Sequence, residues 1–200
     1  MLIIGLTGSI GTGKSATARM FAARGAPVHD ADAAVHRLYA AGGAAVAPVA
    51  AAFPGVVRDG AIDRALLGKH VLGDDAAMAK LEAIVHPLVH GEEKAFLAAA
   101  RGKRVRQAVI EVPLLLETGG AVRCDCVVVV TVAADIQRQR VLARPGMGVE
   151  KLSAILAKQM SDAEKRRRAH FIIDTGFGFA AAEQAVADIM RAVACMPGRS

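Results

Sequence analysis

The residues whose types and spacing indicate chemistry lie near the N-terminus, from residue 8 to residue 15. They read Gly-Ser-Ile-Gly-Thr-Gly-Lys-Ser, which is a glycine, four residues, and then Gly-Lys-Ser. This spacing is typical of a loop whose backbone N–H groups surround the phosphates of a nucleotide. Lys14 could then reach the β- and γ-phosphates, and the Ser15 hydroxyl could hold Mg²⁺. The candidate phosphate-binding residues are Gly8, Ser9, Ile10, Gly11, Thr12, Gly13, Lys14, Ser15 and Ala16.

Carboxylates follow two later apolar stretches and could act on the same phosphates. Asp30 and Asp32 come just after residues 27–29, and Glu111 ends the run that begins at residue 107. A carboxylate at such a place can accept the proton of an attacking hydroxyl or sit beside Mg²⁺. The alternatives are a helix cap for Asp30, a surface carboxylate for Asp32 and a solvated loop carboxylate for Glu111.

Basic residues are concentrated toward the C-terminal half. Arg140 and Arg144 are four residues apart and therefore share one face of a helix, from which Arg140 could clamp a transferring phosphoryl group. The run Lys165-Arg166-Arg167-Arg168 is either a nucleic-acid patch or, more commonly, a solvated helix face. His86 by itself would more often be structural than catalytic.

The elements that must position these residues alternate between strand-like and helix-like patterns. Expected strands cover residues 2–7, 27–29, 107–112, 126–132 and 171–173, with helical patterns between them. This alternation predicts a parallel α/β sheet with crossover helices. Residues 59–101 read as helical with no convincing strand, and Pro87 is expected to interrupt the helix there. We expect this block to be an insert between the second and third strands.

Composition limits the classes of partner. The chain of 200 residues is 54% hydrophobic with a net charge of +6, so it can bury a core and favours polyanionic ligands such as nucleotides or nucleic acid. Aromatic residues make up only 4%, which disfavours stacking on single strands. Three cysteines argue against a disulfide framework. No leader or membrane-length apolar run is visible, so we expect a cytoplasmic protein without a membrane partner.

Five segments, taken in order, resemble the dephospho-coenzyme A kinase family over nearly the whole chain. The phosphate loop alone is shared by many nucleotide-binding proteins, but the other four segments make the ordered set specific. The segments are Leu6–Ser15, the Asp-Ala-Asp at residues 30–32, His86-Pro87, the Pro-Leu-Leu-Leu-Glu at residues 113–117, and Ile173–Gly176.

The resemblance implies a P-loop NTPase of the α/β class, with a five-stranded parallel sheet like that of nucleoside monophosphate kinases, a helical substrate insert and a lid. The implied division is a nucleotide-binding core at residues 1–58, 102–136 and 169–200, a helical coenzyme A domain at 59–101 and a lid at 137–168. The implied reaction moves the γ-phosphate of ATP, with Mg²⁺, to the ribose 3′-hydroxyl of dephospho-CoA and yields CoA and ADP. A monomer or weak homo-oligomer that binds no nucleic acid is expected.

The resemblance also implies a role for individual residues. Asp32 would be the general base, Lys14 would hold the phosphates, and Ser15 would hold Mg²⁺. Arg140 would be the lid arginine. The acceptor site would be lined or supported by His86, Pro113, Leu114, Leu115 and Glu117. Three residues differ from the usual family pattern: Ser9 replaces a glycine, Ala16 a second hydroxyl, and His170 an aspartate.

Two other functions remain open from the sequence. One is a P-loop kinase for another small hydroxyl acceptor, which the His-Pro and Pro-Leu-Leu segments disfavour. The other is an NTP-dependent regulatory or nucleic-acid-binding protein that uses the basic helix after residue 162 and binds nucleic acid in a salt-sensitive way.

Overall fold

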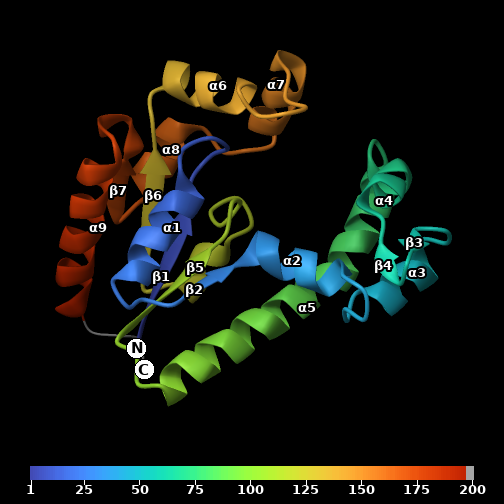
Figure 1. The fold of residues 1–200 in the computed structure, drawn as a ribbon, viewed down its shortest axis with the longest axis horizontal. Coiled ribbons are helices and arrows are strands. Elements are labelled where there is room, and N and C mark those ends of the chain that lie inside the picture. The colour runs from blue at the N-terminus through green and yellow to red at the C-terminus, as the bar shows by residue number, and fades with distance from the viewer. Residues whose placement is uncertain (197–200) are drawn as a thin grey trace. The chain divides into compact units, whose positions relative to one another are not determined.

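A five-stranded sheet forms the centre of the larger part of the chain (Figure 1). The computed structural model describes residues 1–196. The strand order is β2-β5-β1-β6-β7, and the pairs β1–β5, β1–β6 and β6–β7 are parallel. The strands are β1 (Leu2–Thr7), β2 (Val28–Asp30), β5 (Gln107–Glu111), β6 (Cys126–Thr131) and β7 (Phe171–Asp174). The expected parallel α/β sheet is confirmed.

Helices cover this sheet, which explains why its central strands are continuous apolar runs. All six residues of β6 are buried, as a strand covered on both faces requires. Phe21 of α1 and Val186 of α9 belong to one apolar cluster with Ile4 and Val128 of the sheet. The helices of this part are α1 (Lys14–Ala23), α6 (Ala134–Leu142), α7 (Val149–Ala157), α8 (Asp162–Arg168), α9 (Phe179–Ala194) and the short η1 (Gly120–Arg123) and η2 (Thr175–Phe177).

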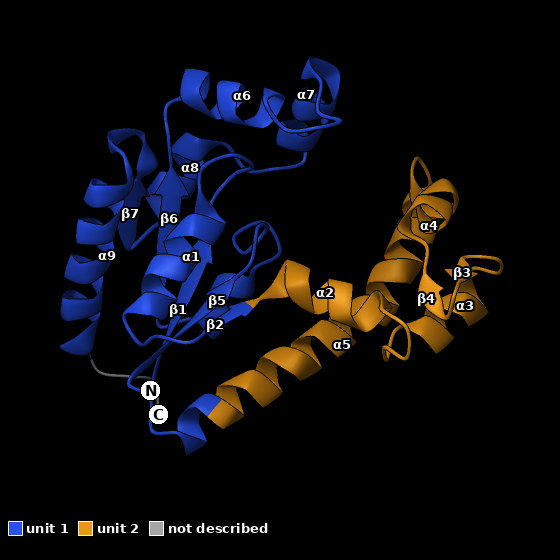
Figure 2. Cartoon of the chain, in the orientation of Figure 1, with its two compact units in different colours: residues 1–29, 100–200 blue, residues 30–99 orange. Residues whose placement is uncertain are grey.

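The chain divides into two compact units, residues 1–29 with 100–200 and residues 30–99 (Figure 2). We call them the nucleotide unit and the helical unit. The helical unit has its own apolar cluster, which includes Leu38, Val49, Leu67 and Leu81. Its elements are α2 (Ala31–Tyr39), α3 (Val46–Ala52), β3 (Val57–Arg58), β4 (Ala61–Ile62), α4 (Arg64–Val71) and most of α5 (Asp75–Gly102). Among residues 1–196, no helix is both long and apolar enough to cross a bilayer.

The helical unit begins at residue 30, whereas the sequence pattern placed its start at residue 59. The reason is packing, because α2 and α3 contribute Leu38 and Val49 to the cluster that α4 and α5 complete. A helical pattern in the sequence does not show which core a helix joins. The division into a coenzyme A domain and a lid remains a prediction.

Two local expectations for the helical unit are wrong. Residues 57–62 form a small antiparallel hairpin rather than helix, because Asp59 and Gly60 both adopt positive φ angles of 50° and 75° and reverse the chain. Pro87 does not interrupt α5, which runs from Asp75 to Gly102 with the proline inside it. A packed amphipathic helix of 28 residues tolerates the one hydrogen bond that proline removes.

Candidate active site

The phosphate loop connects β1 to α1 and leaves the N-terminus of α1 open to an anion. A side chain at Gly8 would collide with the carbonyl oxygen of Val130, so the loop lies tightly against β6. Gly13 is the N-cap of α1 with φ 99°, and among the described residues no side chain caps this helix. By contrast, Asp30 caps α2. An uncapped helix N-terminus behind a glycine loop is a binding site for phosphate.

Ser9 fits the loop even though the family usually has glycine there. Its carbonyl oxygen accepts hydrogen bonds from the Thr12 hydroxyl at 2.9 Å and from the Thr12 N–H at 3.3 Å. Ser9 itself is not among the residues with positive φ. No left-handed backbone is therefore needed at this position, and a serine is accommodated without strain.

Ser15 and Glu111 bring two oxygen ligands together at the loop. The Ser15 hydroxyl donates to Oε1 of Glu111 at 3.1 Å, and Glu111 is the buried last residue of β5. Hydroxyl and carboxylate oxygens are the ligands that Mg²⁺ prefers, so this pair fits the ion that a nucleotide brings. On the neighbouring segment, the Thr7 hydroxyl donates to the carbonyl oxygen of Pro113 at 3.1 Å, which fixes the start of residues 113–117 to β1.

Two glutamines fix the ends of the α6–α7 hairpin to one residue of the phosphate loop. Nε2 of Gln137, on α6, donates to the carbonyl oxygen of Ile10 at 2.7 Å. Oε1 of Gln159, two residues beyond α7, accepts from the N–H of Ile10 at 3.2 Å. Both backbone groups of Ile10 are therefore bonded to the hairpin, and a movement of the hairpin is transmitted to the loop.

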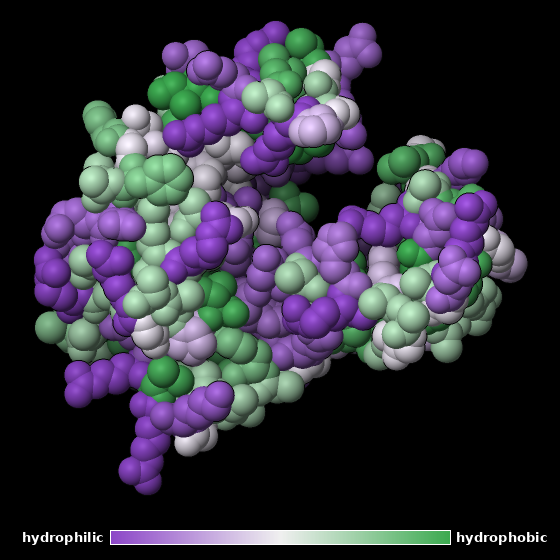
Figure 3. Space-filling model, in the orientation of Figure 1, coloured by the Kyte–Doolittle hydropathy of each residue, from purple (hydrophilic) through white to green (hydrophobic). Residues whose placement is uncertain are grey.

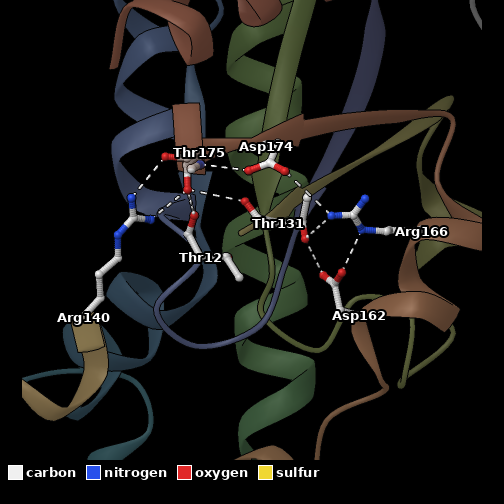
Figure 4. A network of polar contacts seen from close by, with 8 residues as sticks. Thr12, Thr131, Arg140, Asp162, Arg166, Asp174 and Thr175 are labelled. Atoms are coloured by element: carbon white, nitrogen blue, oxygen red, sulfur yellow. Dashed lines mark hydrogen bonds and ion pairs between the residues drawn. The ribbon is translucent and has the colours of Figure 1, made fainter. Parts of the chain in front are cut away.

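Thr175 joins the phosphate loop to Arg140 (Figure 4). Its hydroxyl donates to the carbonyl oxygen of Thr12 at 2.7 Å and accepts from Nη1 of Arg140 at 2.8 Å. Nη2 of Arg140 also donates to the carbonyl oxygen of Thr175 at 3.1 Å. The hydroxyl lies 3.4 Å from the carbonyl oxygen of Thr131, but its single proton goes to the nearer Thr12 oxygen.

A pocket of about 400 Å³ opens beside this threonine. Its walls come from the phosphate loop, α1, α6 and the start of α9, and Arg140, Arg144 and Phe179 face it. Phe179 is 72% exposed, which is unusual for an aromatic residue without a ligand. A pocket of this size, with two guanidinium groups and an exposed ring next to a phosphate loop, suits a nucleotide base and ribose.

Glu117 forms a buried ion pair on the side of the sheet where α8 lies. Its Oε1 is 2.8 Å from the ammonium of Lys165, which is 0% exposed, and also accepts from the Met160 N–H at 2.9 Å. Burial raises the pKa of Glu117, but the hydrogen bonds from Lys165 and Met160 outweigh it and hold the pKa below its ordinary value. This pair joins the segment at residues 113–117 to the chain that follows the hairpin.

The remaining basic residues of α8 are largely used inside the molecule. Nε of Arg166 donates to Asp162 at 2.7 Å, and its Nη2 donates to the Thr131 hydroxyl at 3.1 Å (Figure 4). Arg168 pairs with Glu164 one helical turn away. The helical spacing thus supplies an acidic partner for most of these cations, and the run is not a free basic patch.

The other predicted site residues occupy different environments. Asp30 caps α2 by accepting from the Ala33 N–H at 3.0 Å, while Asp32 is exposed in the first turn of the same helix.

The residues expected at the acceptor site differ in exposure. His86 is exposed on α5 and stacks on His90. In the 113–117 segment, Leu114 is exposed and Leu115 is fully buried, so Leu115 supports this segment from within and does not present a surface to a ligand.

His170 has a structural role at the place where the family usually has an aspartate. Its ring Nδ1 accepts from the Val127 N–H at 3.2 Å, and the backbone N–H of His170 donates to the Val127 carbonyl oxygen at 2.9 Å. The ring thus extends the pairing of β6 with the start of β7. Ala16 lines the pocket beside the phosphate loop, where a hydroxyl would otherwise stand.

Comparison with known proteins agrees with this geometry. The family model for dephospho-CoA kinase matches residues 2–179. The chain belongs to the dephospho-CoA kinase family. A dephospho-CoA kinase from Mesorhizobium japonicum is 62% identical over 93% of both chains. One from Rhodopseudomonas palustris strain HaA2 is 52% identical over 100% of this chain and 99% of that protein. The expectation that the chain is a kinase is confirmed.

Solved structures share the fold. The TT1252 protein from Thermus thermophilus has a TM-score of 0.86 at 31% identity and covers 96% of this chain and 97% of its own. A shikimate kinase from Acinetobacter baumannii has a TM-score of 0.52 at 19% identity, with coverage of 96% and 93%. The second likeness concerns the fold alone.

Sequence reasoning gave no role to three residues that the structure places at the site, and it read a fourth, Lys165, only as part of an exposed basic run, whereas this side chain is fully buried. Gln137, Gln159 and Thr175 contact the phosphate loop, and Lys165 holds Glu117. Polar residues on helices and turns carry no local signal of their partners. Only long-range contacts reveal these roles.

Proposed function

We propose that this chain transfers the γ-phosphate of ATP to the ribose 3′-hydroxyl of dephospho-CoA and releases CoA and ADP. The single observation that carries the proposal is the uncapped N-terminus of α1 behind the glycine loop, with a pocket of about 400 Å³ beside it. Family membership supports the acceptor. A shikimate-type acceptor is disfavoured, because that likeness rests on fold alone.

ATP would bind along the phosphate loop with its base in the adjoining pocket. The backbone N–H groups at the start of α1 and the Lys14 ammonium would hold the β- and γ-phosphates. Arg140 lines the pocket and already contacts Thr175, so a small rotation of its side chain could bring the guanidinium to the phosphates. There it would stabilise the charge that develops on the transferring group.

Mg²⁺ fits the oxygen pair of Ser15 and Glu111. When bound, the ion would neutralise charge on the β- and γ-phosphate oxygens. The Ser15 hydroxyl would turn one of its lone pairs to the ion, and the Glu111 carboxylate would accept hydrogen bonds from its water ligands or bind it directly. The existing contact of 3.1 Å between the two side chains keeps both oxygens on the same side of the loop.

Asp32 would act as the general base. Its exposed carboxylate, two residues after β2, would accept the proton of the 3′-hydroxyl while that oxygen attacks the γ-phosphorus. The bond from the γ-phosphorus to the bridging oxygen would break, and ADP would leave. His86, Pro113 and Leu114 would contact the acceptor, with Leu115 and Glu117 supporting the segment at residues 113–117.

The proposal is tested by incubating the purified protein with ATP, Mg²⁺ and dephospho-CoA and following both ADP release and the mass of the acceptor product. We expect the acceptor to gain one phosphate on the ribose 3′-oxygen at the rate of ADP release. Shikimate, nucleosides and gluconate serve as acceptor controls. Faster ADP release with one of these than with dephospho-CoA would overturn the acceptor assignment.

A further inference from the structure

A second concave region lies at the opposite end of the sheet from the phosphate loop. Two adjoining hollows of about 570 Å³ and 480 Å³ share Arg104, Arg106 and Gln107. They lie where β1 and β5 begin, whereas the phosphate loop follows the other end of β1. The six residues of β1 separate the two regions by roughly 20 Å. We call this region the basal groove.

The basal groove gathers positive charge. Six exposed basic side chains line it: Arg24, Arg101, Lys103, Arg104, Arg106 and Arg191. Arg191 pairs with Asp188, but none of the other five has an acidic partner within residues 1–196. Hydrophilic residues also gather at this end of the unit in Figure 3, around the N-terminus that is marked in Figure 1. Cations on a concave surface concentrate a local positive potential and attract anions.

Gln107 supplies a polar group that is independent of this charge. The residue is buried, lines both hollows and donates from Nε2 to the carbonyl oxygen of Met190 at 2.8 Å. This bond fixes the amide and its orientation. Its Oε1 is buried and has no hydrogen-bond partner among the described residues. A buried acceptor without a partner is costly, and a ligand that carries a hydroxyl or amine would satisfy it.

Arg104 occupies a backbone conformation that favours glycine. Its φ is 56°, in the turn that ends α5, where its N–H bonds to the Arg101 carbonyl oxygen at 2.9 Å. Glycine is the usual residue at such a helix end, because other residues are strained in the left-handed region. A long cationic side chain at this place, facing both hollows, points to a function that outweighs the strain.

We propose that the basal groove binds a small phosphorylated molecule that carries at least two anionic groups and a hydroxyl or amine. The arginines and Lys103 bind its phosphates, and Oε1 of Gln107 accepts a hydrogen bond from its neutral part. The volume of each hollow is in the range of small-molecule sites. This site is separate from the ATP site and does not rest on the proposed function.

The chain offers a reporter for the test. Cys195 is exposed and lies between Ala194 and Met196, which line the groove, whereas Cys124 and Cys126 are buried. An environment-sensitive fluorophore on Cys195 would be titrated with fructose 1,6-bisphosphate and, separately, with inorganic tripolyphosphate, which has no hydroxyl donors. We expect a saturable change with both, tighter for the sugar bisphosphate and weaker at higher salt.

Arg104→Gly is the decisive variant, because it removes the charge and relieves the backbone strain together. We expect the Kd for fructose 1,6-bisphosphate to rise about tenfold, as loss of one charge-assisted hydrogen bond predicts, while the Tm stays equal or rises. Arg19→Ala, which removes an exposed charge from α1, is the matched control and should leave the Kd unchanged. Kinase turnover should be unaffected in both variants, which separates this site from the ATP site.

Gln107→Met tests the neutral contact. It should bring the Kd for fructose 1,6-bisphosphate close to that for tripolyphosphate and leave the latter unchanged. Absence of a saturable signal, or equal weakening by Arg104→Gly and Arg19→Ala, would overturn the proposal. So would saturable binding of a single-stranded oligonucleotide with none of the sugar bisphosphate, because the groove would then serve a nucleic-acid backbone.

Discussion

Asp32 differs from the other candidate residues because its predicted role is chemical and its side chain makes no hydrogen bond or ion pair within residues 1–196. It is exposed in the first turn of α2, while the neighbouring Asp30 provides the helix cap. A substitution at Asp32 should therefore leave the fold intact. This separation makes it the residue at which the proposed mechanism is tested most directly.

Asp32→Asn should reduce turnover by roughly 10²-fold or more while leaving ATP binding nearly unchanged, because the amide cannot accept the hydroxyl proton. Turnover by single-turnover kinetics and ATP affinity by calorimetry check this. Asp75→Asn, at the start of α5, is a control in the same unit. If Asp32→Asn turns over within about threefold of the parent, Asp32 is not the base.

Thr175 is a positioning residue, because its hydroxyl accepts a hydrogen bond from Arg140 and donates one to the Thr12 carbonyl oxygen. Thr175→Val keeps the shape but removes the two hydrogen bonds of the hydroxyl, to the Thr12 carbonyl oxygen and from Nη1 of Arg140, while Nη2 of Arg140 can still donate to the Thr175 carbonyl oxygen. We expect the KM for ATP to rise by about three- to tenfold, because the net contribution of each hydrogen bond is only about 0.5–1.5 kcal/mol and part of the Arg140 contact remains. Thr175→Ser retains the hydroxyl and should restore the KM. Steady-state kinetics with both variants checks this. An unchanged KM for ATP in Thr175→Val would contradict the positioning role of Thr175.

At the scale of elements, hydrogen bonds join the phosphate loop to the α6–α7 hairpin. Both backbone groups of Ile10 bond to glutamines at the two ends of the hairpin. A ligand that orders the loop must then also order the hairpin, and the reverse holds by linkage. The turn at residues 145–148, rich in glycine and mostly exposed, is the place where hairpin opening would become visible.

Gln159→Leu should uncouple the two parts, because leucine cannot accept the Ile10 N–H. We expect that ATP no longer protects the 145–148 turn from proteolysis or amide exchange, while in the parent protein it does. Gln184→Leu, on the outer face of α9, is the matched control and should retain the protection. Full protection in Gln159→Leu would show that the coupling runs through other contacts.

At the scale of the whole molecule, the Glu117–Lys165 pair ties together segments 48 residues apart in the nucleotide unit. Glu117→Gln leaves the fully buried ammonium without its charge partner and should lower the free energy of unfolding by about 3–5 kcal/mol. The double variant Glu117→Gln with Lys165→Met also removes the unpaired buried ammonium, and it should recover much of the lost free energy of unfolding. Denaturant titration of the three proteins checks this; equal losses in the single and double variants would contradict it.

The same pair predicts a pH dependence. Because the folded pKa of Glu117 lies below its ordinary value of 4.5, its contribution to stability is present above that value and is lost as the pH falls through the lower folded pKa. At pH values below about 4.5, the free energy of unfolding should therefore decrease more steeply with falling pH in the parent than in the double variant. Identical slopes would mean that other carboxylates dominate acid unfolding.

Much of the fold and the phosphate site was predictable from local patterns. The buried run of β6 and the glycine spacing of the phosphate loop each depend on residues that are close in sequence. The hairpin at residues 57–62 was predictable in principle from the turn-forming pair Asp59-Gly60. Its strands are only two residues long, however, which is too short to show the alternation of apolar and polar residues that marks a strand. The continuation of α5 through Pro87 was not predictable, because packing along the whole helix outweighs one local break.

The sequence by itself determined the phosphate loop, the order along the chain of the five strands in the main sheet, and the family to which the chain belongs. These depend on spacing and periodicity, which are properties of neighbouring residues. Only the tertiary structure decided that Lys165 is buried against Glu117, that Thr175 joins Arg140 to the loop, and that the cations of the basal groove share one surface. Their partners are far apart along the chain, and a polar side chain acquires its pairing only when folding excludes water and brings them together.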